Sequence, residues 1–277
     1  MSPRQLNRKG IFLESKATLS HTWRDQTIDI AMMKAESAPG SDVARKPGFI
    51  WLGGFRSDMD GTKALAMVDQ AAKLGCSSLR FDYSGHGSSG GQFVEGTISR
   101  WVDESLAVLL EHTQGPQILV GSSMGGWIAL RLAQELKQRG EQDRLAGMLL
   151  IAPAPDFATR LMEPAFTDAQ RQELNDQGYI EEPSAYSDEP NVITRDLIED
   201  GRDNQVLKGD LAVGVPVRIL QGMEDPDVPY THALHLVECL AHDDVQMTLI
   251  KDGDHRLSRE EDIDLLRRTI TQMVSPA

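Results

Sequence analysis

The sequence predicts an α/β fold in which helices cover both faces of a mostly parallel sheet. Short apolar runs, each bounded by Gly, Pro or Asp, alternate with amphipathic stretches of helix length. Parallel strands must be joined by crossover connections, which are usually helices, so this alternation indicates βαβ units. The chain has 277 residues, of which 40% are hydrophobic, and it can therefore bury a large core.

The predicted elements follow in chain order. Runs typical of buried strands are residues 49–52, 78–81, 117–120, 148–151, 217–220 and 245–250. Stretches with helical periodicity are residues 62–74, 97–112, 124–139, 230–241 and 259–273. Gly75, Gly115 and Gly140 follow the first three of these stretches, as glycine often follows the last turn of a helix.

Residues 153–214 break the alternation, because they contain no run that resembles a strand. Within them, residues 156–203 carry 13 acidic and 4 basic side chains, a net charge of −9. Thr167 and Gln170 have the spacing of a capping box that begins a helix, and residues 194–200 form a second candidate helix. The excess of acidic residues in this segment is therefore greater than in the rest of the chain.

So long an excursion between two strands of one sheet is usually an inserted subdomain, and such inserts often cover a site. The sequence therefore predicts a core formed by residues 1–152 and 215–277, with residues 153–214 as an inserted helical lid. The alternative is a solvated surface flap that has no role in function.

The charge balance excludes two classes of partner. The chain has 42 acidic and 28 basic residues, a net charge of −14 and a pI near 4.9. Binding to nucleic acid or to anionic lipid needs clustered basic side chains, and a chain with this excess of acidic residues has few of them to cluster. No apolar run approaches the roughly 20 residues of a membrane-spanning helix. We therefore expect neither a nucleic-acid partner nor a membrane span.

Cysteine usage indicates the compartment. Cys76 and Cys239 form no CxxC motif and have no Cys/His spacing that suits zinc. Two such cysteines make no disulfide framework, so we expect a reducing compartment and a cytoplasmic protein. Residues 1–20 include basic side chains and Glu14 but lack the apolar run of a secretory signal. Targeting to an organelle is the alternative.

The segment Gly121-Ser-Ser-Met-Gly125 fits the pattern G-x-S-x-G, with Ser123 at its centre. A predicted strand leads into it and a predicted helix leads out. In this setting the glycines permit a cramped turn that exposes the serine hydroxyl at the carboxyl edge of the sheet. A serine hydroxyl is a weak nucleophile alone, so the pattern requires a base and an acid that orients it. Ser122 is the alternative nucleophile.

A candidate acid and a candidate base follow later strands. The fifth predicted strand leads to Asp225, with Glu224 and Asp227 as competing acids on the same loop. The last predicted strand leads to His255. Because the carboxyl ends of parallel strands share one edge of a sheet, we expect these side chains to meet Ser123 there.

The span of residues 47–273 resembles the α/β-hydrolase superfamily of serine hydrolases. Four motifs stand in the family's order: Gly53-Gly-Phe55, Asp82-x-x-Gly-x-Gly-x-Ser89, Gly121-x-Ser-x-Gly125 and Gly222-x-x-Asp-x-x-Val-Pro229. More narrowly, residues 54–64, 80–85 and 120–127 are similar to the branch that contains a mitochondrial protein depalmitoylase and acyl-glucuronide esterase. The chain departs from many relatives at Gln221, where they have histidine.

The resemblance implies the α/β-hydrolase fold and a role for each matching residue. Ser123 would be the nucleophile, His255 the base that takes its proton, and Asp225 the acid that orients His255. The backbone N–H groups of Phe55 and Met124 would form the oxyanion hole.

The sequence indicates no cofactor and no metal. His232 and His235 have a spacing that could hold a metal, but no third ligand is evident. The glycine-rich run at residues 85–91 lacks the ending of a phosphate-binding loop. His86 in that run is a candidate to line the pocket.

The predicted function is hydrolysis of a carboxylic ester or thioester through an acyl-Ser123 intermediate, on a small molecule or an acylated protein. Phe157, Met162, Phe166 and Tyr179 could form an apolar wall for the acyl group, or they could pack the insert onto the sheet. The alternatives are a ligand-binding receptor with the same fold and a carbon–carbon bond hydrolase. The acidic insert suggests that anionic substrates are disfavoured and that neutral or cationic leaving groups are tolerated.

Overall fold

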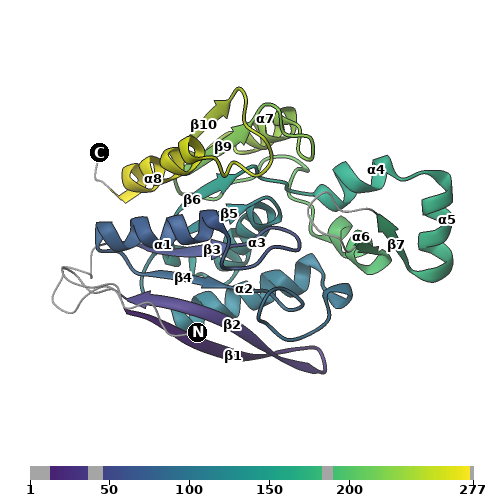
Figure 1. The fold of residues 1–277 in the computed structure, drawn as a ribbon, viewed down its shortest axis with the longest axis horizontal. Coiled ribbons are helices and arrows are strands. Elements are labelled where there is room, and N and C mark those ends of the chain that lie inside the picture. The colour runs from purple at the N-terminus through teal and green to yellow at the C-terminus, as the bar shows by residue number, and fades with distance from the viewer. Residues whose placement is uncertain (1–12, 37–45, 183–189, 275–277) are drawn as a thin grey trace.

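The computed structural model describes residues 13–36, 46–182 and 190–274. Its main sheet has eight strands in the order β1-β2-β4-β3-β5-β6-β9-β10 (Figure 1). The parallel strands are β3 (Gly48–Leu52), β4 (Ser78–Phe81), β5 (Gln117–Ser122), β6 (Leu145–Ile151), β9 (Val217–Gly222) and β10 (Val245–Ile250). These are the strands that the sequence predicts, and they confirm the α/β class.

An antiparallel hairpin extends one edge of this sheet. It consists of β1 (Leu13–Trp23) and β2 (Gln26–Glu36), and β2 pairs antiparallel with β4. The sequence does not predict either strand, because apolar and polar residues alternate along them. Ile28, Ile30 and Met32 are buried, with more exposed residues between them. This alternation is typical of an antiparallel strand with one face in water, and it differs from the continuous apolar runs of the parallel strands.

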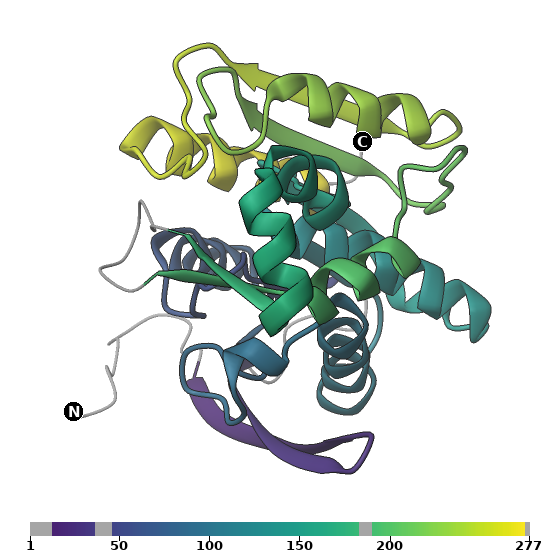
Figure 2. The ribbon, with the colours of Figure 1, turned by 90° about the vertical axis from the view of Figure 1, so that its right-hand side faces the viewer.

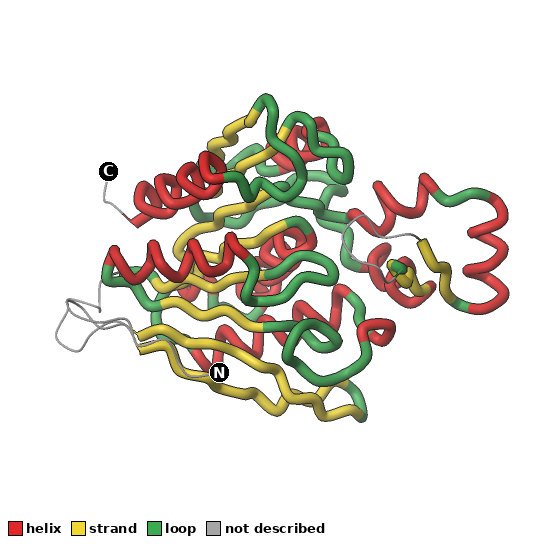
Figure 3. The backbone as a smooth tube through the Cα atoms, viewed as in Figure 1, coloured by secondary structure: helices red, strands yellow, loops and turns green. Residues whose placement is uncertain are grey.

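Helices cover both faces of the sheet, as predicted (Figure 3). One face carries α1 (Thr62–Leu74) and α8 (Glu260–Val274), and the other carries α2 (Ile98–His112), α3 (Met124–Gln138) and α7 (Tyr230–Cys239). Each helix begins and ends within two residues of its predicted range. These bounds follow from local signals, such as the hydroxyl of Thr97, which caps α2 by accepting from the N–H of Arg100.

Residues 153–214 contain α4 (Glu163–Ala165), α5 (Asp168–Gln177) and α6 (Arg195–Asp203), which project from one side of the sheet (Figures 1 and 2). Thr167 and Gln170 make both bonds of the expected capping box, and Thr194 caps α6. The expectation of no strand in this segment is wrong. β7 (Tyr179–Glu182) pairs antiparallel with β8 (Asn191–Thr194). These strands are short and largely polar, so they lack an apolar run.

Both ends of this segment are anchored beside the sheet. The fully buried carboxylate of Asp156 accepts from the N–H groups of Val206 at 2.8 Å and Leu207 at 2.9 Å. The indole of Trp127 in α3 donates to the carbonyl of Asn204 at 3.0 Å. The segment therefore leaves the sheet and returns to it at one place. Asp156, although part of the acidic excess, acts as a buried anchor and not as surface charge.

Three further observations concern the cysteines, the length and composition of the helices, and the N-terminal segment. Cys76 and Cys239 are both buried and free. Within the described part of the chain, no helix is both long enough and apolar enough to cross a membrane. Of the segment weighed as a targeting sequence, residues 1–12 lie outside the described residues, and residues 13–20 belong to β1.

The turn between β5 and α3 packs directly against the ends of its neighbouring strands. A Cβ atom on Gly125 would overlap the carbonyl oxygen of Leu52 at the end of β3. A Cβ atom on Gly121 would overlap the carbonyl oxygen of Gly125. The close approach of backbone groups, and not an unusual φ, therefore requires glycine at both positions.

We expect Gly125→Ala to lower the free energy of unfolding by about 1–3 kcal/mol or more, because the atom that it meets is backbone and cannot swing away. Gly61→Ala is the matched control, since its Cβ would come no closer than 3.7 Å to any neighbour. The control should cost less than about 1 kcal/mol. Urea unfolding followed by circular dichroism measures both, and equal losses would contradict the packing argument.

Candidate active site

Ser123 lies where β5 ends and α3 begins, at the carboxyl edge of the parallel sheet. Its φ of 54° and ψ of −117° form a strained conformation that costs about 1–3 kcal/mol. Hydrogen bonds hold the residue there: its N–H donates to the carbonyl of Ile151, and its carbonyl accepts from the N–H groups of Gly126 and Ala154. Strain at this position is typical of a nucleophile elbow, which aims the serine side chain away from the sheet.

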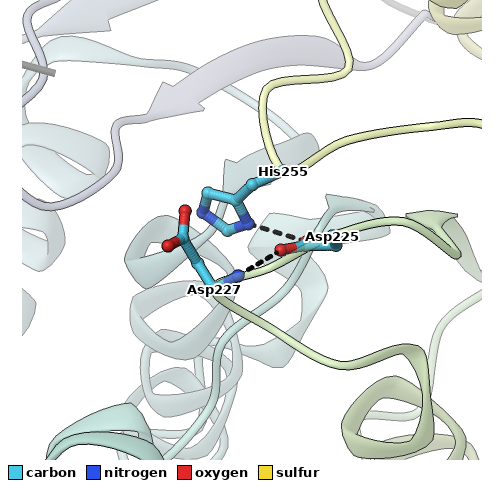
Figure 4. Close-up of side chains that lie close together, drawn as sticks. All are labelled: Asp225, Asp227 and His255. Atoms are coloured by element: carbon cyan, nitrogen blue, oxygen red, sulfur yellow. Dashed lines mark hydrogen bonds and ion pairs between the residues drawn. The ribbon is translucent and has the colours of Figure 1, made fainter. Parts of the chain in front are cut away.

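His255 connects Ser123 to Asp225. Its Nε2 lies 3.0 Å from the Oγ of Ser123. Its Nδ1 lies 2.8 Å from the Oδ2 of Asp225, a contact that Figure 4 shows. Because a carboxylate only accepts hydrogen bonds, the proton of the neutral ring belongs on Nδ1. Nε2 is then free to accept the hydroxyl proton of Ser123. The structure thus brings together the three residues that the sequence selects from three separate strand ends.

The carboxylate of Asp225 is buried and well supplied with donors. Its Oδ1 accepts from the backbone N–H groups of Asp227 at 2.9 Å and Val228 at 2.8 Å. Burial raises the pKa of Asp225, but the hydrogen bond and charge of His255, together with the two backbone bonds, outweigh burial and lower that pKa overall. Asp225 is therefore ionised at neutral pH and can stabilise a positive charge on His255.

The competing acids on this loop have different surroundings. Glu224 and Asp227 are both exposed. Figure 4 shows the Asp227 carboxylate beside the His255 ring, while Nδ1 is bonded to Asp225. The geometry therefore favours Asp225 as the acid that orients the histidine.

The same cluster has the spacing of a metal site. Asp225, Asp227 and His255 each offer a ligand atom, and these atoms lie within 4.8 Å of one another. Both carboxylate oxygens of Asp225, however, already accept hydrogen bonds, one of them from Nδ1 of His255. A metal ion would have to replace these bonds, whereas an acid–base pair accounts for all of them. The arrangement of donors and acceptors therefore favours acid–base chemistry.

Gln221, the residue that replaces histidine in this chain, supports the acid loop. It is fully buried at the end of β9, and its Nε2 lies 3.1 Å from the Oδ2 of Asp225 and 3.1 Å from the carbonyl of Val228. The sequence gives no role to this position. The signal that could have identified it is its place as a polar residue directly after the apolar pair Ile219-Leu220, four residues before the acid.

The two proposed oxyanion donors flank Ser123. Met124 is the first residue of α3, where a backbone N–H has no partner within the helix. Phe55 follows Gly54, and a Cβ built on Gly54 would lie 3.5 Å from the Cβ of Ser123. The loop after β3 therefore passes beside the serine, which is the placement that a donor to an oxyanion requires.

Other candidates from the sequence fall outside this cluster. Ser122 is buried as the last residue of β5. His86, a candidate to line the pocket, is 3% exposed and accepts the backbone N–H of Arg56 through Nε2. His232 bonds through Nε2 to the carbonyl of Pro155 at 2.7 Å.

The aromatic residues that the sequence selects in the insert divide into two groups. Phe157 is buried and packs edge-to-face on Phe55, with ring centroids 5.6 Å apart, and on Trp127 at 5.4 Å. Phe166 is also buried, whereas Tyr179 is 39% exposed. Phe157 therefore joins the insert to the loop beside Ser123.

These groups suit nucleophilic catalysis. A serine hydroxyl, a base within hydrogen-bond reach and an ionised acid behind that base are the parts needed to form and release a covalent intermediate. Backbone donors beside the serine add a place for developing negative charge.

Comparison with known proteins identifies the family of this chain. Residues 40–268 match the model of the alpha/beta hydrolase family. Mitochondrial palmitoyl-protein thioesterase ABHD10 of Mus musculus is 33% identical over 260 residues, which cover 94% of this chain and 83% of the relative. The human enzyme of the same name is 33% identical over 94% of this chain and 81% of its own length.

Solved structures extend the likeness to the fold. A candidate hydrolase from Agrobacterium vitis S4 superposes with a TM-score of 0.90 at 55% identity, covering 95% of this chain and all of that one. Mouse alpha/beta hydrolase domain-containing protein 10 gives a TM-score of 0.79 at 32% identity, covering 94% and 98%. Est1E from Butyrivibrio proteoclasticus shares the fold at 19% identity, with a TM-score of 0.71 over 88% and 94% of the two chains. Because residues 40–268 match the family model and these relatives cover most of its length, the chain belongs to the alpha/beta hydrolase family.

Proposed function

We propose that this protein hydrolyses carboxylic esters or thioesters through a covalent acyl-Ser123 intermediate. The observation that carries the proposal is the continuous chain of hydrogen bonds from the Oγ of Ser123 through His255 to Asp225, with distances of 3.0 and 2.8 Å. Membership of the hydrolase family and the names of its thioesterase relatives support it.

The reaction would proceed in two halves. Nε2 of His255 accepts the hydroxyl proton while Oγ of Ser123 attacks the acyl carbon, and the carbonyl oxygen becomes an oxyanion held by the N–H groups of Phe55 and Met124. The imidazolium, stabilised by Asp225, then gives its proton to the departing alcohol or thiol. Water repeats the sequence on the acyl-enzyme, and the products are the free acid and the restored serine.

An apolar acyl group is the substrate that the surroundings favour. Phe55, on the loop beside the serine, packs against Phe157 of the insert, and Met162 is half-buried further along the insert. Relatives named palmitoyl-protein thioesterases support an acyl thioester, carried by a small molecule or a protein. Residues 153–214 are proposed to act as the lid over this site.

We propose that the protein is cytoplasmic, as the sequence predicts. Two buried, free cysteines support a reducing compartment. The mitochondrial relatives keep organelle targeting as the alternative.

We expect a fluorophosphonate probe to label the wild-type protein covalently and irreversibly, because the probe reacts only with an activated serine. Ser123→Ala should abolish labelling, and Ser122→Ala should retain it. Intact-protein mass spectrometry measures both, alongside hydrolysis of p-nitrophenyl esters and acyl thioesters of increasing length. A folded wild type that binds acyl ligands without labelling or turnover would contradict the proposal and favour a receptor.

The two neighbouring aspartates should differ sharply in their effect on catalysis. Asp225→Asn should lower kcat by about 10⁴-fold, because the amide no longer stabilises the required tautomer and charge of His255. Asp227→Asn is the matched control and should change kcat by less than about tenfold, since its side chain does not hold Nδ1. A larger loss in the Asp227 variant would reverse the assignment of the acid.

The acidic insert is proposed to disfavour anionic substrates through its field. The triple variant Asp168→Lys, Glu173→Lys and Asp176→Lys reverses three exposed charges on α5. We expect kcat/KM for an anionic ester to rise relative to that for a neutral ester of equal length, and the gain to shrink as salt is added. If the ratio of the two kcat/KM values did not change at low salt, the proposal would be contradicted, and the acidic charge of the insert would contribute to solubility alone.

A further inference from the structure

His86 bridges two backbone segments behind the active site. It lies in the loop after β4, and its ring is almost fully buried. Nε2 accepts from the backbone N–H of Arg56 at 3.2 Å, and Nδ1 lies 3.2 Å from the carbonyl oxygen of Ser84. Because the N–H of Arg56 only donates and the carbonyl of Ser84 only accepts, both contacts require one neutral tautomer, with the proton on Nδ1.

Arg56 belongs to the tight turn that carries Phe55. The N–H and the hydroxyl of Ser57 both donate to the carbonyl of Gly54, at 3.1 and 2.8 Å. The φ of Arg56 is 58°, a value that favours glycine at the third position of a turn. An arginine is therefore held in a strained conformation, and a strained residue persists only where its surroundings hold it. The bond from its N–H to His86 is part of that support.

The surroundings of His86 keep its ring neutral. Tyr83, Phe93 and Trp101 pack around it, with ring centroids between 5.1 and 5.5 Å away. Burial lowers the pKa of His86 to about 4; the bond to the Ser84 carbonyl opposes this shift, and the charge of Arg56 adds to it. Nε2 therefore remains an acceptor at neutral pH.

We propose that His86 is a positioning residue for hydrolysis: by accepting the N–H of Arg56, it holds the Gly54–Ser57 turn in the conformation that directs the N–H of Phe55 at the oxyanion. The inference rests on the proposed function, in which Phe55 is one of two oxyanion donors. Because Gly54 lies against Ser123, a small change in this turn alters the position of the donor relative to the nucleophile. His86 acts through the backbone and touches no substrate.

Loss of this bond should affect the chemical step more than substrate binding. The oxyanion exists only in the transition state and the intermediate, so a misplaced donor lowers kcat and leaves KM nearly unchanged. Removal of one oxyanion donor costs about a hundredfold to a thousandfold in kcat. A donor that is displaced but still present should cost less, at about tenfold to a hundredfold.

The test compares two substitutions at one position. His86→Phe fills the aromatic surroundings but offers no acceptor, whereas His86→Gln places an acceptor oxygen at a reach similar to that of Nε2. We expect His86→Phe to lose about tenfold to a hundredfold in kcat and in the rate of fluorophosphonate labelling, with KM changed less than about threefold. His86→Gln should recover most of the loss. Amide hydrogen exchange should show faster exchange at Arg56 in the Phe variant only.

A stability control separates positioning from general damage. Leu136→Ala removes buried methyl groups at the far end of α3 and should lower the melting temperature while leaving kcat at the wild-type value. The inference would be overturned if kcat stayed unchanged in His86→Phe, if the Gln variant lost as much as the Phe variant, or if Leu136→Ala lost kcat equally. An inactive wild type would overturn the proposed function and this inference together, whereas an active wild type with an active His86→Phe variant would overturn this inference alone.

Discussion

Backbone packing between the β5–α3 turn and the ends of β3 and β6 is the constraint on which the site depends. Leu52 pairs with Gly121, and Ser122 pairs with Ile151, so the registers of two parallel strand pairs meet at this turn. A slip of one residue would turn every side chain of a strand to the opposite face of the sheet. The same registers determine where the loop after β3 begins, and hence where the N–H of Phe55 lies relative to Ser123.

Backbone strain gathers at this edge of the sheet. Among the described residues that are not glycine, positive φ values occur at Arg24 in the β1–β2 turn and otherwise at Arg56, Ser123, Ala152, Asp156 and Leu257. These five residues all follow the carboxyl ends of parallel strands. The sheet and its helices provide the stability that lets these loops keep unfavourable conformations, and such strain is common where reacting groups must be held in place.

The sequence predicts the parallel strands and the main helices, and it selects the three residues that the structure brings together at the candidate site, because each has a local signal. Continuous apolar runs mark β3 and β5, and the motif around Ser123 requires its strand–turn–helix setting. The β1–β2 hairpin and the β7–β8 pair could not be predicted in this way, since their residues alternate or are polar and their pairing depends on contacts that are distant in the chain. The support that Gln221 and His86 give to the site is missed for the same reason: each bonds to backbone or side-chain atoms whose position only the fold determines.

His255 and His86 lie near the site, and their different surroundings give the two imidazole rings different chemical properties. His255 has the carboxylate of Asp225 at Nδ1 and the hydroxyl of Ser123 at Nε2, so in the proposed reaction a proton taken from Ser123 produces a charge that Asp225 stabilises. His86 has a carbonyl at Nδ1 and an N–H group at Nε2, within a shell of aromatic rings. A proton added to that ring would break the bond to Arg56 and would have no carboxylate partner among its hydrogen bonds. Burial without a counter-charge therefore keeps His86 an acceptor, while the carboxylate of Asp225 suits His255 to the role of base that we propose for it.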